Sequence, residues 1–170
     1  MLKTPIFSIV APIYNEEGNI AELYRRISAI MSDVGAAWEL VLVDDGSQDE
    51  SPRLLAALYA DHPDIVRVIR FARNFGHQIA VTAGMHYSSG EAVILIDADL
   101  QDPPEMIREM VERWREGYEV VYAVRSNREG ESWFKRTTAS LFYRILYRIT
   151  DVSIPLDTGD FRLMDRRVVD

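Results

Sequence analysis

The sequence is poor in two residue types that carry much of protein chemistry, cysteine and lysine. Its 170 residues include no cysteine, so disulfide bonds, thiolate zinc sites and iron–sulfur clusters are excluded. Lysine occurs only as Lys3 and Lys135. Neither lies in the Gly-Lys-Ser/Thr pattern of a P-loop, and neither follows a predicted strand, where a receiver-type phospho-acceptor domain needs one. All other basic residues are arginines, which hold phosphate in a bidentate manner better than lysines do.

Long hydrophobic runs are also missing. The longest is Leu54–Ala60, far short of the roughly 20 residues that span a bilayer, so we expect no membrane span within this chain. No apolar signal segment follows Met1, which predicts a cytoplasmic location. With 48% hydrophobic and 27% charged residues, the length predicts one globular domain over residues 1–170.

The net charge of −8 is unevenly distributed along the chain. Residues 1–124 contain 10 basic and 20 acidic side chains, whereas residues 125–150 contain 6 basic and 2 acidic ones. The acidic first part argues against nucleic acid as a partner, because a protein that binds nucleic acid generally needs a basic surface. The basic segment indicates a local anionic partner instead.

Short apolar segments alternate with segments of helical periodicity, which predicts an α/β fold. The pattern favours a mostly parallel sheet with helices on both faces. We expect Pro12 to end the first strand. We expect Asp102 to cap the helix predicted over residues 102–116. The predicted strands are Ile6–Ala11, Trp38–Val43, Ile65–Phe71, Ala92–Ile96 and Tyr118–Val124, with a further strand signal at Phe161–Met164. The predicted helices are Glu17–Val34, Ser51–Ala60, Gly76–Ser88 and Asp102–Glu116.

Polar clusters follow five of the predicted strands. Because parallel strands bring their carboxyl ends to one edge of a sheet, we expect these clusters to form a single site. The clusters are Tyr14-Asn15-Glu16, Asp44-Asp45, Arg73-Asn74, Asp97-Ala98-Asp99 and Arg125. The turn after the first strand lacks G-x-G-x-x-G, which excludes the dinucleotide-binding fingerprint.

Asp97 and Asp99 are candidate ligands of a divalent cation, with Gln101 as a third oxygen donor. Mg²⁺ and Mn²⁺ prefer such oxygen ligands and commonly share them with a substrate diphosphate. The alternative is an acidic loop that caps the next helix. Asp44-Asp45 could bind a ribose or a base, or form an ordinary Asp-Gly turn. Arg125 could face a phosphate or be a solvated surface charge.

Together these motifs resemble family 2 glycosyltransferases of the GT-A fold, over about residues 6–168. Within that family the sequence is most similar to the polyprenyl-phosphate branch, which includes dolichol-phosphate mannose synthase and bacterial undecaprenyl-phosphate glucosyltransferases. The segments that carry the resemblance are 11–17 (APIYNEE), 43–49 (VDDGSQD), 73–78 (RNFGHQ), 97–104 (DADLQDPP) and 157–162 (DTGDFR). Members of the bacterial branch usually continue into further helices, often two membrane spans, so we expect a missing C-terminal part.

The resemblance implies roles for matching positions. Pro12, Tyr14 and Glu16 would line the nucleotide pocket, and Asp44 and Asp45 would lie toward base and ribose. Asp97, Asp99 and Gln101 would hold Mg²⁺ or Mn²⁺ against the donor diphosphate. Arg125, Arg136 and Ser140 would bind the acceptor phosphate. Asp157 is the candidate base or orienting group, or alternatively a turn cap before Gly159.

The implied activity is inverting transfer of a hexose to a polyprenyl phosphate at the cytoplasmic face of the membrane, with UDP-glucose the preferred donor. A phosphate monoester is largely ionised at pH 7, since its second pKa is about 6, so proton removal should contribute little. Two alternatives stay open, a saccharide acceptor and a non-catalytic domain that binds a nucleotide or membrane. A homo-oligomer is compatible with either.

The basic segment from Arg125 to Arg148 combines apolar residues at helical spacing with interleaved charges. One interpretation is a helix packed on the sheet or on a partner subunit. The other is an interfacial helix on the membrane, with Arg125 and Arg136 drawing the lipid phosphate toward the metal site.

Overall fold

The computed structural model describes residues 5–124 and 158–170. Residues up to 122 and 160–170 form one compact unit and residues 123–159 a second, and the sheet and site described below lie essentially in the first. None of the helices in these ranges is long and apolar enough to cross a bilayer. The elements are β1 (Phe7–Ile13), α1 (Ile20–Val34), β2 (Trp38–Asp44), α2 (Ser51–Asp61), β3 (Val66–Arg70), α3 (His77–Tyr87), β4 (Ala92–Leu95), η1 (Pro104–Met106), α4 (Ile107–Arg115), β5 (Val120–Val124), β6 (Thr158–Asp165) and α6 (Arg166–Val169).

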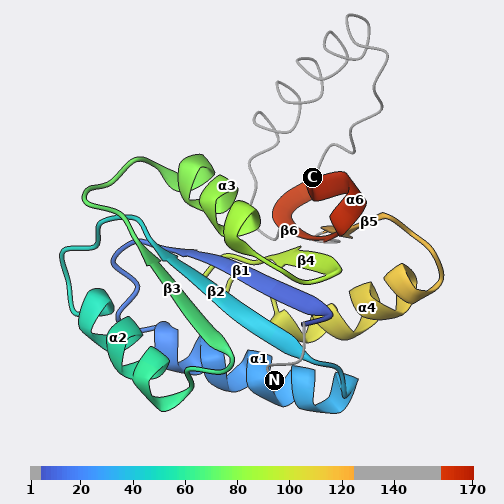
Figure 1. Ribbon diagram of the computed structural model, residues 1–170, viewed down its shortest axis with the longest axis horizontal. Helices are drawn as coiled ribbons and strands as arrows, with labels where there is room; N and C mark the ends of the chain where they lie inside the picture. Colours follow the sequence, from blue (N-terminus) through green and yellow to red (C-terminus); the bar gives the residue numbers. More distant parts are fainter. Residues whose placement is uncertain (1–4, 125–157) are drawn as a thin grey trace, which may run out of the picture. The chain divides into compact units, whose positions relative to one another are not determined.

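The strands form one six-stranded sheet in the order β3-β2-β1-β4-β6-β5. Strands β3, β2, β1 and β4 are parallel to one another, and β6 runs antiparallel to β4 (Figure 1). The prediction of a mostly parallel α/β sheet is therefore confirmed. The reversed strand β6 matters for function, because it begins at the edge of the sheet where the parallel strands end.

Helices cover both faces of the sheet, as expected. Helix α3 lies on one face, and α1, α2 and α4 lie on the other (Figure 1). Under α3, buried Val10, Val41 and Val93 pack against Ala80. Gly84 allows this close packing, since a Cβ there would lie 2.3 Å from Cγ1 of Val10. Every residue of β1 except Pro12 is fully buried, which explains its nearly continuous apolar sequence.

Pro12 does not end the first strand, contrary to the prediction. Strand β1 continues to Ile13, with Pro12 paired to Val43 of β2. The even-numbered positions of β1 turn their backbone toward β4, as the bond from Ile96 N–H to the Val10 carbonyl shows. Strand β4 has already ended at Leu95, so the missing N–H of Pro12 interrupts no ladder.

The N-cap position of the following helical turn is Pro103 and not Asp102, which is a second correction. A 3₁₀ turn begins at Pro104 and leads into α4, and the cap position belongs to Pro103, which makes no side-chain cap bond. Asp102 is instead 6% exposed. Pro104 suits the first helical position, because its φ is fixed near the helical value.

Several predicted site residues lie outside the described residues, namely Arg125, Arg136, Ser140 and Asp157. The same holds for the whole of the basic amphipathic segment that we predict between Arg125 and Arg148.

Candidate functional site

A cleft of about 290 Å³ opens at the carboxyl ends of β1, β2 and β4. This is at the lower end of the range for small-molecule sites. Its walls come from four of the five predicted clusters: Pro12, Ile13, Tyr14, Glu16, Asp45, Asn74, His77, Ala80, Asp97, Ala98 and Asp99. Larger hollows of about 570 and 530 Å³ lie along α4 and at the opposite edge of the sheet. We take the smaller cleft as the candidate site because it alone, among the hollows in the described ranges, gathers the strand-end loops.

The loops after β1 and β2 are tied together by side-chain hydrogen bonds to backbone amides. Asn15 N–H donates to Oγ of Ser47 at 3.0 Å, and Gln48 N–H donates to Oδ1 of Asn15 at 2.8 Å. Glu16 N–H donates to Oγ of Ser51 at 3.0 Å. Asn15 has a positive φ of 56°, a conformation that asparagine tolerates better than most residues. These bonds fix the wall that carries Tyr14 and Glu16.

The two neighbouring carboxylates Asp44 and Asp45 play different structural roles. Asp45 accepts hydrogen bonds from the N–H groups of Phe75 and Gly76 at 2.7 and 2.9 Å, so it joins the end of β2 to the loop before α3. Asp44 is fully buried and accepts from Ser47 N–H at 2.8 Å, the geometry of an Asp turn. Asp45 lines the cleft, whereas Asp44 is not among its lining residues.

Gly46 lets these two loops approach each other. Its φ is +73°, and a Cβ there would lie 2.4 Å from the carbonyl carbon of Arg73. Any other residue would push the loop of residues 71–76 away from the cleft. Arg73 itself lies over the Phe75 ring, with its guanidinium carbon 4.1 Å from the ring centroid, and does not line the cleft.

Asp97 and Asp99 both line the cleft, directly after β4. Oδ1 of Asp99 accepts a hydrogen bond from Gln101 N–H at 3.0 Å. Leu100, between Asp99 and Gln101, has a positive φ of 59°. This conformation strains a non-glycine residue and indicates a backbone held in place by its surroundings. The Gln101 side chain is exposed and is not among the cleft-lining residues.

The structure adds two residues to the site that the sequence interpretation left without a role, His77 and Asp160. Nε2 of His77 lies 3.1 Å from Oδ2 of Asp160 and 3.8 Å from Oδ1 of Asp97. Asp160 is here because β6 is antiparallel: Arg162 pairs with Leu95, so continuing this register brings Asp160 opposite Asp97. Both residues belong to motifs of the family resemblance, but their convergence required the strand direction of β6.

Negative charges outnumber positive ones in this cluster. Burial raises the pKa of Asp97, the charge of His77 opposes this rise, and the neighbouring carboxylates Asp160, Asp99 and Asp102 add to it. One imidazole therefore lies among several carboxylates in a half-buried position. Ligand atoms of His77, Asp97 and Asp160 all lie within 4.8 Å of one another. An anionic set of two carboxylates and one imidazole suits a divalent cation.

The comparisons with known proteins agree with this geometry. Residues 8–170 match the family model described as glycosyl transferase family 2. The chain belongs to this family. It is 57% identical over 164 residues to an uncharacterized glycosyltransferase, YkcC, of Bacillus subtilis, covering 96% of this chain and 50% of the relative. It is 40% identical over 163 residues to the bactoprenol glucosyl transferase of Shigella phage SfV, covering 96% of this chain and 53% of the relative. The chain thus spans about half the length of these relatives.

Solved structures identify the fold. Glucosyl-3-phosphoglycerate synthase of Mycobacterium tuberculosis, solved with Mn²⁺, UDP-glucose and phosphoglyceric acid, aligns with a TM-score of 0.66 at 24% identity. The alignment covers 96% of this chain and 58% of that one. Together with the mostly parallel sheet, this establishes the GT-A fold for the chain and confirms the fold class predicted from the sequence.

Proposed function

We propose that this protein transfers glucose from UDP-glucose to a polyprenyl phosphate, inverting the anomeric centre. The observation that carries the proposal is the 40% identity to bactoprenol glucosyl transferases over 96% of the chain. The cleft supports it independently, because a carboxylate-rich edge after β4 suits a cation that neutralises a leaving diphosphate.

Pro12, Tyr14, Glu16, Asp45 and Asn74 form the part of the cleft that we assign to the nucleotide. Tyr14 is 44% exposed and can offer its ring to a base, while Asp45 holds the loop that carries Asn74. For Asp44 the proposal is indirect, since its buried carboxylate shapes the turn beside the base and ribose rather than lining the cleft.

Asp97, with Asp99 beside it, would hold the divalent cation, and His77 and Asp160 are close enough to complete its ligands. A bound cation supplies positive charge where negative charge develops on the leaving diphosphate. The hydrogen bond from Gln101 N–H fixes the Asp99 carboxylate in advance, which avoids its reorganisation during the reaction. Gln101 is kept as a proposed ligand of this cation.

In the reaction, an oxygen of the acceptor phosphate attacks the anomeric carbon and forms the new C–O bond. The bond from that carbon to the diphosphate breaks, and UDP leaves with the bonding electron pair. The acceptor needs little help from a base, since a phosphate monoester is mostly dianionic at pH 7. Arg125, Arg136 and Ser140 remain our predicted acceptor contacts and Asp157 the predicted orienting group. In this scheme the reaction takes place at the cytoplasmic face of the membrane, where the lipid phosphate is presented.

The test is a product assay with the purified protein and undecaprenyl phosphate in detergent micelles, with Mg²⁺ or Mn²⁺. Parallel reactions receive UDP-glucose, UDP-galactose or GDP-mannose, and the lipid product is identified by mass spectrometry. We expect glucosyl-phosphoundecaprenol from UDP-glucose, in the β configuration because the donor is α-linked. Glucosylation of an added saccharide without any lipid product would contradict the proposal in favour of a saccharide acceptor.

A further inference from the structure

Three side chains from distant parts of the sequence meet at the cleft: His77 and Asp97 line it, and Asp160 lies beside them. His77 is the first residue of α3, Asp97 follows β4, and Asp160 lies in β6. Their side chains are 41%, 35% and 41% exposed, so each can reach a ligand in the cleft while keeping a fixed position. Within the described residues, α3 buries Ala80, Val81 and Gly84, so His77 is not part of the packing of this helix.

The distances match the spacing of ligands around one metal ion. Donor atoms bound at roughly 2.0–2.1 Å to the same cation stand about 3.0–3.3 Å apart when adjacent. Nε2 of His77 is 3.1 Å from Oδ2 of Asp160 and 3.8 Å from Oδ1 of Asp97. The His77–Asp160 distance already falls in this range, and all three ligand atoms lie within 4.8 Å of one another.

The surrounding charges also favour a cation. Among the described cleft-lining residues, His77 is the only one able to carry a positive charge, whereas Glu16, Asp45, Asp97 and Asp99 are acidic. The helix dipole at the start of α3 opposes a cation. The negative charge of Asp45 offsets this dipole, because its carboxylate accepts hydrogen bonds from the N–H groups of Phe75 and Gly76, just before the helix.

We propose that His77 is a direct ligand of the cleft cation and makes the site prefer a transition-metal ion over Mg²⁺. The inference rests on the proposed function for the need of a cation. The chemistry follows from the ligand type: Mg²⁺ prefers an all-oxygen shell with several waters, whereas an imidazole strengthens binding of Co²⁺ or Zn²⁺ more than that of Mg²⁺. As a ligand His77 binds through neutral Nε2, so its proton resides on Nδ1.

The experiment measures metal binding directly, without turnover. Co²⁺ and Mg²⁺ are titrated into the apo protein by calorimetry, and the visible absorption of bound Co²⁺ reports nitrogen ligation. The variants are His77→Ala and, as matched control, His86→Ala, which removes an exposed histidine from the other end of the same helix. We expect His77→Ala to weaken Co²⁺ binding by about 10-fold or more and Mg²⁺ binding by less than about 3-fold. His86→Ala should change neither.

Two outcomes would overturn the inference. Equal loss of Co²⁺ and Mg²⁺ affinity in His77→Ala would mean that His77 only orders the cleft. Unchanged Co²⁺ affinity and an unchanged Co²⁺ spectrum would remove it from the ligand set altogether. Either result leaves the proposed function intact if the wild-type protein still makes the glucosylated lipid with Mg²⁺. Absence of that lipid with every metal would instead refute the proposed function.

Discussion

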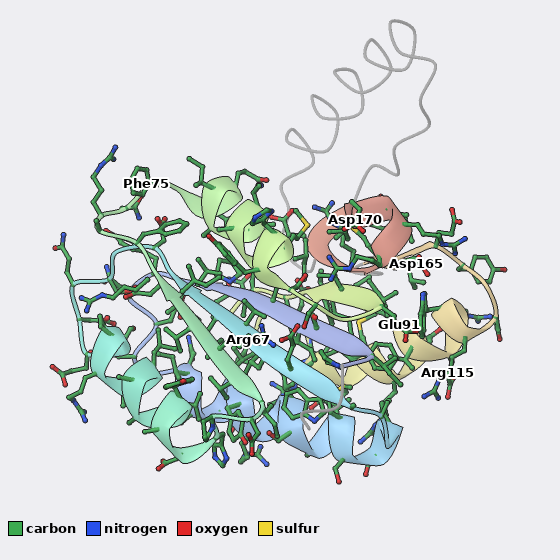
Figure 2. All side chains as sticks on the ribbon, in the orientation of Figure 1. Arg67, Phe75, Glu91, Arg115, Asp165 and Asp170 are labelled. Carbon is green, nitrogen blue, oxygen red and sulfur yellow. The ribbon has the colours of Figure 1, made fainter. Side chains whose placement is uncertain are left out.

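The two edges of the parallel sheet both carry carboxylates, but they use them in opposite ways. At the amino edge, where β1, β2 and β4 begin, acidic side chains are matched by donors and arginines. At the carboxyl edge, Asp97 and Asp160 share one histidine, and the charge of Asp99 acts on Asp97. Figure 2 places Phe75, on the loop beside the cleft, at one end of the view, and Glu91 and Asp165 at the other. Asp44 and Asp45 at the carboxyl edge are also held by backbone N–H groups, so the contrast concerns the Asp97–Asp160 pair, which has one imidazole between two carboxylates.

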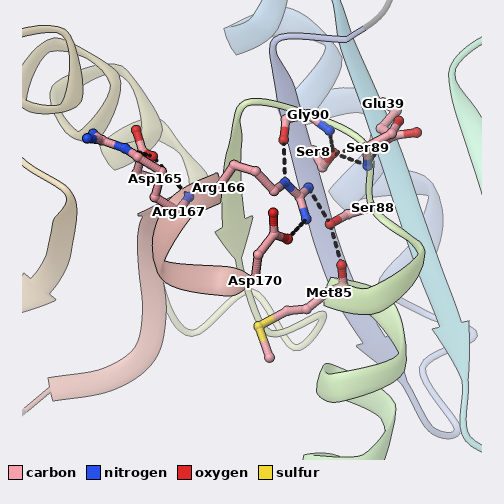
Figure 3. Close-up of polar contacts among 10 residues, drawn as sticks. All are labelled: Ser8, Glu39, Met85, Ser88, Ser89, Gly90, Asp165, Arg166, Arg167 and Asp170. Carbon is pink, nitrogen blue, oxygen red and sulfur yellow. Dashed lines mark hydrogen bonds and ion pairs between the residues drawn. The ribbon is translucent and has the colours of Figure 1, made fainter.

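Glu39 illustrates the matched edge. Its Oε1 accepts from Ser8 Oγ at 2.6 Å and from the N–H and Oγ of Ser89 at 2.7 and 2.8 Å (Figure 3). Nε of Arg67 lies 2.7 Å from Oε2 of Glu39. The two groups form an ion pair, but their geometry is not that of a hydrogen bond. Only 3% of Glu39 is exposed, so this buried charge is kept by its partners and is structural.

The same edge continues around α6. Arg166 donates to the Gly90 carbonyl and to Ser88 Oγ, both at 2.9 Å, and lies 3.5 Å from a carboxylate oxygen of Asp170 (Figure 3). Asp165 accepts from Trp114 Nε1 at 2.8 Å and from Arg167. The Arg167 guanidinium, followed by the Trp114 indole, holds the pKa of Asp165 well below its usual range. The pKa of Asp97 moves in the opposite direction because burial dominates there.

The largest effect should follow a change at the unmatched edge. Asp97→Asn should lower turnover by about 10²–10³-fold, because the leaving diphosphate loses a cation ligand. The melting temperature should stay the same or rise, since one of several crowded negative charges is removed. Turnover in the lipid assay and thermal unfolding check both expectations. Asp64→Asn, an exposed acid outside the cleft, is the matched control. A strongly destabilised Asp97→Asn variant would break the comparison.

At the matched edge the expected effect is on stability. Glu39→Ala leaves the Ser8 and Ser89 donors and Arg67 without their partner, which should cost about 3 kcal/mol in the free energy of unfolding. Denaturant titration measures this, with Glu91→Ala as the exposed control at the same edge. Turnover of the folded fraction should be unchanged. A stable but inactive Glu39→Ala protein would show that this edge also serves catalysis.

A smaller, pH-dependent effect is expected for Asp165→Asn. Because the pKa of Asp165 is lowered in the folded state, its ionised form stabilises the fold above the ordinary value near 3.8. That contribution is lost as the pH falls toward the depressed value. The substitution should cost about 1 kcal/mol at pH 7, since Arg167 is largely exposed, and the difference from wild type should shrink below about pH 4. Urea unfolding at pH 3 and 7 tests this, and a difference that does not change with pH would contradict it.

Much of this arrangement could be predicted from the sequence, for a physical reason. Buried parallel strands such as β1 and β2 show continuous apolar runs, and ligands gather where those strands end. The sequence therefore predicts that Tyr14, Asp45 and Asp97 lie together, and all three line one cleft. The sequence does not predict that β1 continues past Pro12, because this depends on β4 ending at Leu95, which is a property of the sheet. His77 and Asp160 were missed as site residues because only the antiparallel register of β6 brings them together.

The most direct test of the account is calorimetric titration of the protein with UDP, once with Mn²⁺ in excess and once in EDTA. If the unmatched carboxylates at the carboxyl edge form a joint site for cation and diphosphate, UDP should bind at least about 10-fold more tightly with Mn²⁺, a coupling of about 1.4 kcal/mol or more. Asp97→Asn should abolish the difference. Equal UDP affinity in Mn²⁺ and EDTA, or UDP binding unaffected by Asp97→Asn, would contradict the assignment of this edge as the cation and nucleotide site.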